Sequence, residues 1–226
     1  KTCHENNLKN IIFSSTAAAY GNPKNNNSIK EDEVLSPLNP YGLSKIKTEN
    51  FLIKNKDKIN SIILRYFNVA GADLKLRSGL ISDEPTHLIK VLSEVAVGKK
   101  DKILVYGNDY NTPDGTAIRD YIHVTDLANI HLETAKYLLE NKTSNLFNCG
   151  YGKGYSVLEV INAANRITKN KINFEFDQRR PGDSEKLISN VEKLHENIDW
   201  KPKYDNLDLI IQSAINWEKK IYEKNL

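Results

Sequence analysis

The sequence predicts an α/β protein, because short buried strands alternate with helices along the chain. Residues 10–15 and 61–66 are short apolar runs of the kind that fill the interior of a parallel sheet. Between them a helix is expected over residues 40–54, with Pro40 at its first position, where helices favour proline. A strand, a helix and a second strand in this order indicate a parallel sheet with helices packed on it.

The rest of the chain continues this alternation. Residues 1–10 are expected to be the end of a helix that runs into the first strand, 21–38 a long loop, and 144–149 a further strand. Ser156 and Glu159 form a capping-box pattern that predicts the start of a helix. Two helical stretches each carry an apolar face. The first face is Val157, Val160, Ile161, Ala164 and Ile167, and the second is Leu207, Ile210, Ile211, Ala214, Trp217 and Ile221.

Composition excludes several classes of function. The 226 residues are 39% hydrophobic and 27% charged, with a net charge of +3, which is ordinary for a globular protein. The sequence has no apolar run near the roughly 18 residues that span a bilayer, and no basic block interleaved with aromatic residues. We therefore expect neither a membrane nor a nucleic-acid partner. Cys3 and Cys149 form no pattern typical of disulfides, and the five histidines show no metal-ligand spacing, which favours a cytoplasmic protein without a metal site.

The sequence contains no methionine, so Lys1 is not a translation start. We expect either that the start was removed or that these residues are a piece of a longer protein.

Tyr41 and Lys45 lie four residues apart on the helix expected over 40–54, so their side chains share one face. An ammonium group beside a phenol stabilises the phenolate, which suits tyrosine to act as a base near neutral pH. The spacing alone is weak evidence, because both residue types are frequent here. Thr16 strengthens it, since it ends the first strand, where open α/β sheets bind ligands. The alternative is that Thr16 merely caps the following turn.

With these three residues, the sequence resembles the extended short-chain dehydrogenase/reductase family, whose catalytic triad is Ser or Thr, Tyr and Lys. Longer strings narrow the resemblance to the UDP-glucose 4-epimerase family. They are residues 64–72 (LRYFNVAGA), 106–124 (YGNDYNTPDGTAIRDYIHV), 148–154 (NCGYGKG) and 179–183 (RRPGD). The similarity runs over nearly the whole chain, and strings of this length do not arise by chance.

The resemblance implies the carboxy-terminal portion of a doubly wound, Rossmann-type NAD-binding domain, followed by a smaller mixed α/β substrate domain. Residues 1–70 would be the remainder of the NAD-binding domain. Residues 71–226 would mainly bind the UDP-sugar, with about 120–150 returning to the NAD-binding domain. The glycine-rich phosphate loop of the family occurs nowhere in the sequence, so roughly 100 residues of family sequence are absent. We therefore expect these residues alone to be inactive.

The family interconverts UDP-glucose and UDP-galactose through a transient 4-keto sugar with enzyme-bound NAD, and the resemblance lends roles to residues of this chain. The catalytic residues would be Thr16, Tyr41 and Lys45. The residues that contact NAD would be Ser14, Ser15, Tyr41, Lys45, Tyr66 and Phe67. The residues that bind the UDP-sugar would be Thr16, Asn68, His87, Leu88, Leu104, Tyr106, Arg119, Arg180, Asp183 and Leu187.

Physical chemistry agrees with the nucleotide-binding roles. Arginines such as Arg119 and Arg180 suit a pyrophosphate because of their forked donors, and an aromatic such as Tyr106 can cover a uracil ring. The alternatives are surface ion pairs, Arg119 with Asp120 and Arg180 with Asp183, and a Tyr106 that is simply part of the core.

Three positions differ within the family. Many members carry Ser in place of Thr16, and some carry Asn in place of His87, but both residues here keep a hydrogen-bonding side chain. Leu187 stands where a large Tyr fills the space that an N-acetyl group needs and smaller residues leave it open. We therefore expect N-acetylated UDP-sugars to be accepted at least in part.

The helix over 40–54 also predicts an interface. Leu43, Ile46, Phe51 and Ile53 spread around it, which is more apolar surface than one buried face needs. In the family this helix and the one ending near residue 1 pack against their twins, which implies a homodimer.

Two alternatives remain open. A sugar-nucleotide dehydratase or decarboxylase of the same family typically carries an acid about two residues after the strand-end Ser or Thr. Here residues 17–19 are all alanine, so water elimination lacks its usual acid. The other alternative is a non-catalytic sugar-nucleotide-binding remnant.

Overall fold

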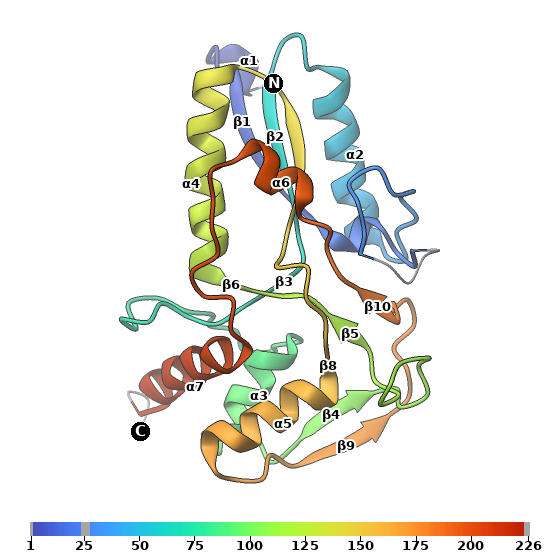
Figure 1. Cartoon of the computed structure of the whole chain (residues 1–226), viewed down its shortest axis with the longest axis vertical. Helices are drawn as coiled ribbons and strands as arrows, with labels where there is room; N and C mark the ends of the chain where they lie inside the picture. The colour runs from blue at the N-terminus through green and yellow to red at the C-terminus, as the bar shows by residue number, and fades with distance from the viewer. Residues whose placement is uncertain (1, 24–27, 224–226) are drawn as a thin grey trace.

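The computed structural model describes residues 2–23 and 28–223 (Figure 1). Its helices are α1 (Thr2–Glu5), the short 3-10 helix η1 (Ala17–Ala19), α2 (Pro40–Lys54), α3 (Leu88–Ala96), α4 (Val124–Asn141), α5 (Val157–Thr168), α6 (Glu192–Asn197) and α7 (Leu207–Glu223). Its strands are β1 (Asn10–Thr16), β2 (Asn60–Tyr66), β3 (Asn68–Ala70), β4 (Ile103–Tyr106), β5 (Ile118–Arg119), β6 (Tyr121–His123), β7 (Asn145–Cys149), β8 (Tyr155–Ser156), β9 (Phe174–Asp177) and β10 (Lys186–Leu187).

A parallel sheet of β1, β2 and β7 confirms the predicted α/β class (Figure 1). Its strands begin and end within one residue of the three predicted strands. The central strand, β2, is almost wholly buried, as expected of an apolar run in a parallel sheet. Successive side chains point to opposite faces: Arg65 reaches Glu49 on α2, and Tyr66 contacts His131 on α4. The helices α2 and α4 therefore cover opposite faces of this sheet.

The second part of the molecule packs α3, α5 and α7 together beside the parallel pair β4–β9 (Figure 1). The predicted capping box starts α5, since the Ser156 hydroxyl accepts from Glu159 N at 3.0 Å and the Glu159 carboxylate accepts from Ser156 N at 2.7 Å. The apolar faces predicted on the helices that are now α5 and α7 meet in its core. Buried members of that core are Ile89, Leu92, Ile103, Val105, Val160, Ile161, Ala164, Ile210 and Ile211.

Short strands join the two parts. β3 pairs with β6, and β5 lies between β10 and β8. From β6 the chain enters α4 and returns through β7 to the main sheet, so the carboxyl end of that sheet faces the second part (Figure 1).

Within residues 2–23 and 28–223, no helix is long and apolar enough to cross a membrane. The same residues contain no group of His, Cys, Asp or Glu that could hold a metal ion. Cys149 is a free cysteine in the core of β7, and burial raises the pKa of its thiol. The side chain of Cys3 lies outside the described part.

Candidate active site

The first two strands of the main sheet end side by side. Thr16 and Tyr66 are the last residues of β1 and β2, and they are partners in the parallel register. Ligands of open α/β sheets bind beyond such carboxyl ends. The site therefore starts from Ser14, Thr16 and Tyr66.

Local sequence brings the start of α2 against this edge. The Asn39 side chain caps the helix by accepting from Gly42 N at 2.8 Å, and Pro40 follows the cap. A Cβ atom at Gly42 would lie 2.6 Å from the carbonyl oxygen of Ala18, so only glycine allows this approach. The first turn of α2, which carries Tyr41, is thereby held against the turn that follows Thr16.

Lys45 links this helix to the strand. Its ammonium group donates to the Ser14 carbonyl oxygen at 2.8 Å and lies 5.1 Å from the centroid of the Phe13 ring. It also lies 5.6 Å from the centroid of the Tyr41 ring, so the two side chains share one face. Tyr41 itself is 56% exposed and can be reached by a ligand.

Thr16 caps the turn that follows β1, which is the simpler of the two roles considered for it. Its hydroxyl oxygen accepts from Ala18 N at 3.1 Å and caps the turn after β1. That bond uses a lone pair and leaves the hydroxyl proton available for a ligand. Capping and ligand binding are therefore compatible at this position.

The predicted cofactor residues divide into two groups. The Tyr66 hydroxyl donates to Ser14 Oγ at 2.7 Å, and burial raises the pKa of Tyr66 to about 12, so it remains a protonated donor. Ser15 and Phe67 are buried. The hydroxyl of Ser15 bonds to Glu49, and the Phe67 ring packs in an apolar cluster. Their side chains therefore belong to the interior, whereas Ser14 and Tyr66 border the open edge.

A cavity of about 380 Å³ gathers most of the predicted substrate residues. Those on its wall are Asn68, His87, Leu88, Leu104, Tyr106, Arg119, Arg180 and Asp183. Thr16 lies apart from this wall, at the end of β1. Leu187 also lies apart, on β10, where it packs against the cluster that contains Phe67 and Ala17.

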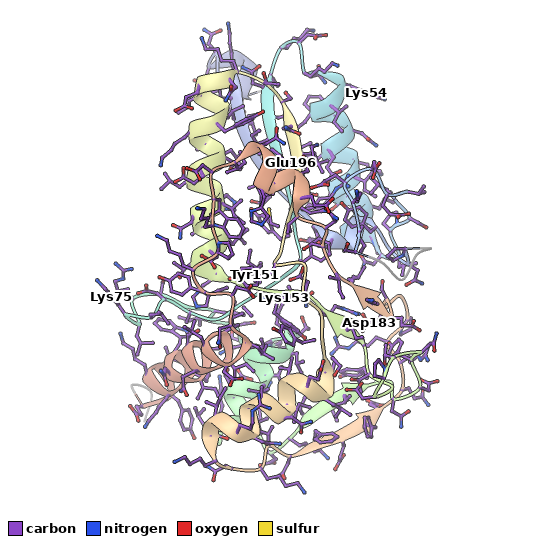
Figure 2. The ribbon with its side chains drawn as sticks, in the orientation of Figure 1. Lys54, Lys75, Tyr151, Lys153, Asp183 and Glu196 are labelled. Atoms are coloured by element: carbon purple, nitrogen blue, oxygen red, sulfur yellow. The ribbon has the colours of Figure 1, made fainter. Side chains whose placement is uncertain are left out.

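The arginines of the cavity do not form the ion pairs considered from the sequence, which were Arg119 with Asp120 and Arg180 with Asp183. Arg119 forms its ion pair with Asp183 instead of Asp120, and it also donates to the Ser184 carbonyl oxygen at 2.6 Å (Asp183 is labelled in Figure 2). The Arg180 guanidinium lies 3.7 Å from the centroid of the Tyr106 ring. A cation thus stands over an aromatic face on the cavity wall, the arrangement that can hold a planar base next to a phosphate.

Two lysines on this wall were not predicted. Lys100 and Lys102 line the cavity, and their ammonium groups pair with Glu94 at 2.8 Å and Glu175 at 2.6 Å. The available signal was the basic cluster over residues 99–102. Of the four lysines and arginines on the wall, Arg180 alone forms no ion pair within residues 2–23 and 28–223, so its charge is the one available to an anionic ligand.

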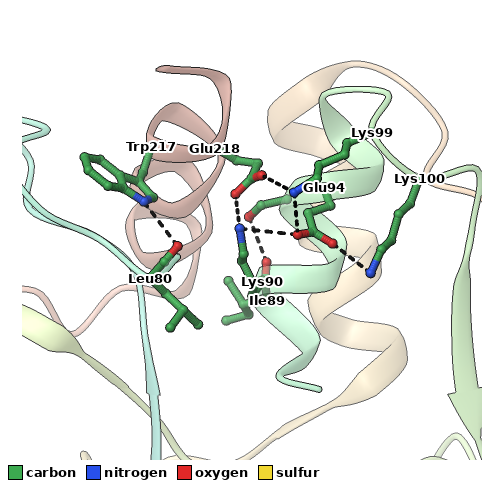
Figure 3. A network of polar contacts seen from close by, with 9 residues as sticks. Leu80, Ile89, Lys90, Glu94, Lys99, Lys100, Trp217 and Glu218 are labelled. Carbon is green, nitrogen blue, oxygen red and sulfur yellow. Dashed lines mark hydrogen bonds and ion pairs between the residues drawn. The ribbon is translucent and has the colours of Figure 1, made fainter. Parts of the chain in front are cut away.

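A buried cluster of charges holds α3, whose first residues line the cavity (Figure 3). Lys90 on α3 pairs with Glu218 on α7 and lies 3.4 Å from Glu94. Lys99 and Lys100 pair with Glu94 at 3.2 and 2.8 Å. Burial opposes ionisation of Glu94, but hydrogen bonds from Lys100 and Lys99 outweigh it and lower the pKa of its carboxyl. The cluster fixes α3 against α7, and with it the position of Leu88.

The sequence is similar to a known protein family and to curated proteins. The family model described as GDP-mannose 4,6 dehydratase matches residues 1–212. A UDP-glucose 4-epimerase of Azospirillum brasilense is 43% identical over 221 residues, which are 97% of this chain and 63% of that protein. The chain thus spans about 63% of the length of this curated relative.

Two solved structures are also similar. UDP-glucose 4-epimerase from Bifidobacterium longum, in complex with NAD+ and UDP, has a TM-score of 0.89 and 36% identity, and covers 96% of this chain and 66% of its own. The UDP-Glc/GlcNAc 4-epimerase of Campylobacter jejuni has a TM-score of 0.78 and 45% identity, and covers 97% of this chain and 67% of its own.

Proposed function

The chain belongs to the UDP-glucose 4-epimerase family, and on that premise we propose that the protein interconverts UDP-glucose and UDP-galactose with bound NAD. The observation that carries the proposal is the pairing of Tyr41 and Lys45 on α2, which is held against the turn after Thr16, together with a cavity whose wall carries Arg119 and Arg180. Tyr41 and Lys45 can move a proton, and the cavity can hold a nucleotide diphosphate.

The residues at the open edge fit a nicotinamide cofactor. Lys45 has three ammonium protons, and one is used by the Ser14 carbonyl oxygen, so the others can hold a ribose diol. Tyr66 at the end of β2 is a neutral phenol that can donate a hydrogen bond to the cofactor. A bound NAD would supply the hydride chemistry at sugar carbon 4.

Tyr41 performs the proton transfer in this proposal. Its phenolate takes the proton of the sugar 4-hydroxyl while Thr16 hydrogen-bonds the same oxygen. The ammonium group of Lys45 lies 5.6 Å from the centroid of the Tyr41 ring, on the same face of α2. After the 4-keto sugar turns over in the site, Tyr41 returns the proton to its oxygen, so the residue ends the cycle as it began.

The cavity would hold the UDP group. Arg180 can present its forked donors to the diphosphate and Tyr106 a ring face to the uracil, while Arg119 contributes to the same wall as the partner of Asp183. Asn68, His87 and Leu88 border it from β3 and the start of α3. We accordingly propose residues 71–226 as mainly the UDP-sugar domain, with about 120–150 belonging, like 1–70, to the NAD-binding domain.

Partial acceptance of N-acetylated UDP-sugars is proposed as well. Leu187 is smaller than tyrosine, and its side chain packs beside Phe67 at the junction of the two parts. The similarity to an epimerase described as acting on both UDP-Glc and UDP-GlcNAc supports this proposal.

We also propose a homodimer formed through α2. Leu43, Phe51 and Ile53 are 46%, 56% and 50% exposed on this helix, an apolar surface that a partner would cover. Light scattering at micromolar concentration tests it, and a monomeric mass would contradict it. A cytoplasmic location, expected from the cysteine pattern, also stays a proposal.

A sugar-nucleotide dehydratase is the second candidate, because the description of the matching family names a dehydratase. The residues after Thr16 disfavour it. Ala17 and Ala19 are buried, and none of residues 17–19 supplies a carboxyl for water elimination. The experiment that separates the two is product analysis after incubation with UDP-glucose: UDP-galactose supports epimerisation, and a dehydrated 4-keto product supports elimination. The third candidate, a non-catalytic binding module, predicts UDP binding without either product.

We propose finally that the 226 residues alone neither hold NAD tightly nor epimerise. No glycine-rich phosphate loop is present in them, and β1 forms one edge of the sheet in the described part. Calorimetric titration of the 226-residue chain with NAD tests this directly. Micromolar affinity would show that the cofactor site is complete without the loop.

A further inference from the structure

An arginine interrupts the apolar run of the central strand. Arg65 is 3% exposed, and burying a charge there is costly unless it is fully paired. Glu49, 1% exposed on α2, pairs with it through two parallel bonds, Nε to Oε1 at 3.0 Å and Nη2 to Oε2 at 2.6 Å. Such a buried pair is often no more stabilising than two apolar residues of the same size. Stability alone therefore does not account for it.

The pair is the centre of a larger set of bonds. Arg65 Nη1 donates to the Tyr20 hydroxyl at 2.9 Å, and Tyr20 donates to Asn148 Oδ1 at 2.6 Å. The Ser15 hydroxyl donates to Glu49. We call these five residues the Arg65 network. They come from β1, the turn after it, α2, β2 and β7, so the network joins α2 to all three strands of the main sheet.

Three members of the network stand close in the sequence to candidate active-site residues. Ser15 stands directly before Thr16 on β1, and Arg65 directly before Tyr66 on β2. Glu49 follows Lys45 by four residues, so the two lie one above the other on the same side of α2. The place where the Glu49 carboxylate is held therefore sets the rotation of α2 about its axis.

We propose that Arg65 and Glu49 are positioning residues, which fix α2 against β1 and β2 and thereby set Tyr41 and Lys45 in register with Thr16. This inference rests on the proposed function for its effect on turnover. Catalytic groups must be held within about 0.5 Å, and a displacement of about 1 Å can cost on the order of 100-fold in rate. A forked ion pair between two buried side chains holds α2 against the strands with that accuracy.

The test replaces the pair without leaving a lone charge. The double variant Glu49→Leu/Arg65→Met keeps the volume and removes both charges, so it should fold. The assay uses the holoenzyme, which is the whole protein with NAD bound. We expect its kcat for UDP-galactose to fall at least about 30-fold, because α2 loses its register. KM should change less than about threefold, because the cavity that would bind UDP contains neither residue.

A milder variant covers the case in which the double variant does not fold. Tyr20→Phe removes one hydroxyl from the network and should lower kcat about fivefold to tenfold at nearly constant KM. Its matched control is Tyr110→Phe, because the buried Tyr110 hydroxyl has no hydrogen-bond partner among the described residues. The control should keep wild-type kcat.

A second measurement does not depend on turnover. Acetic anhydride labelling of Lys45, followed by mass spectrometry, reports how firmly its ammonium group is held at Ser14, with the exposed Lys54 of the same helix as internal reference. In the double variant and in Tyr20→Phe, Lys45 should label faster relative to Lys54. Folded variants with wild-type kcat and an unchanged labelling ratio would overturn the inference. A wild-type holoenzyme without epimerase activity would instead count against the proposed function, and the labelling ratio would still decide this inference.

Discussion

Replacing Arg180 by glutamine should weaken UDP binding without disturbing the fold. The guanidinium lies 3.7 Å from the centroid of the Tyr106 ring at the cavity wall, and no ion pair of the described residues holds it there. A charge-assisted bond to phosphate contributes about 1.5–3 kcal/mol, and glutamine keeps part of the polarity. We take the net loss as about 2 kcal/mol, which corresponds to about a 30-fold rise in Kd.

The preceding residue provides the matched control. Arg179 lies 4.0 Å from the centroid of the Tyr110 ring and pairs with Asp109 at 2.6 Å, and the cavity wall does not include it. Arg179→Gln removes the same charge from the same loop. Isothermal titration of both variants with UDP at fixed ionic strength is the assay, and Arg179→Gln should change Kd less than about threefold. Equal losses in the two variants would refute the reasoning, because only general charge attraction would then be at work.

Three further predictions follow from the same geometry. Tyr41→Phe in the holoenzyme should lower turnover at least about 100-fold, with an unchanged circular dichroism spectrum; near-normal conversion of UDP-galactose would show that another group is the base. The holoenzyme should turn over UDP-N-acetylgalactosamine, and Leu187→Tyr should abolish this turnover while conversion of UDP-galactose continues; a lack of any N-acetylated product from the unmodified protein would contradict the assignment of Leu187. Because the pKa of Glu94 is lowered in the fold, its contribution to stability is present above the usual glutamate pKa of about 4.3 and is lost as pH falls through the folded value. The urea midpoint should therefore fall below about pH 4, and it should fall less steeply in Glu94→Gln; identical pH profiles would argue against the role of the cluster.

Local patterns predicted the three strands of the main sheet and the helices α2, α5 and α7, whereas α3 and α4 were not predicted. The apolar run at 61–66 and Pro40 at the start of α2 are signals carried by neighbouring residues, and both elements were predicted within one residue. The strands of two or three residues, such as β5 and β6, are too short to show an alternation of side chains. Their existence depends on pairing with distant strands, which a single sequence does not reveal.

In the candidate site, too, some features could be predicted from the sequence and others could not. Motif resemblance identified eight of the eighteen residues on the cavity wall, including its arginines and Tyr106, because several of them stand in long, characteristic strings. It did not identify the partners. Arg119 pairs with Asp183, which lies 64 residues away, and Ser15 bonds to Glu49 across the face of the sheet. The buried arginine within 61–66 was the available signal, because a charge in an apolar strand requires a partner from elsewhere in the fold.

The direct test of the central claim is the conversion of UDP-galactose by the holoenzyme, followed by separation of the nucleotide sugars at intervals until the mixture stops changing. The account predicts that UDP-glucose appears, that the same final ratio is reached from either sugar, and that no net NADH accumulates, because the hydride returns to the sugar in each cycle. A product that has lost water, or NADH formed in step with the sugar consumed, would contradict the account.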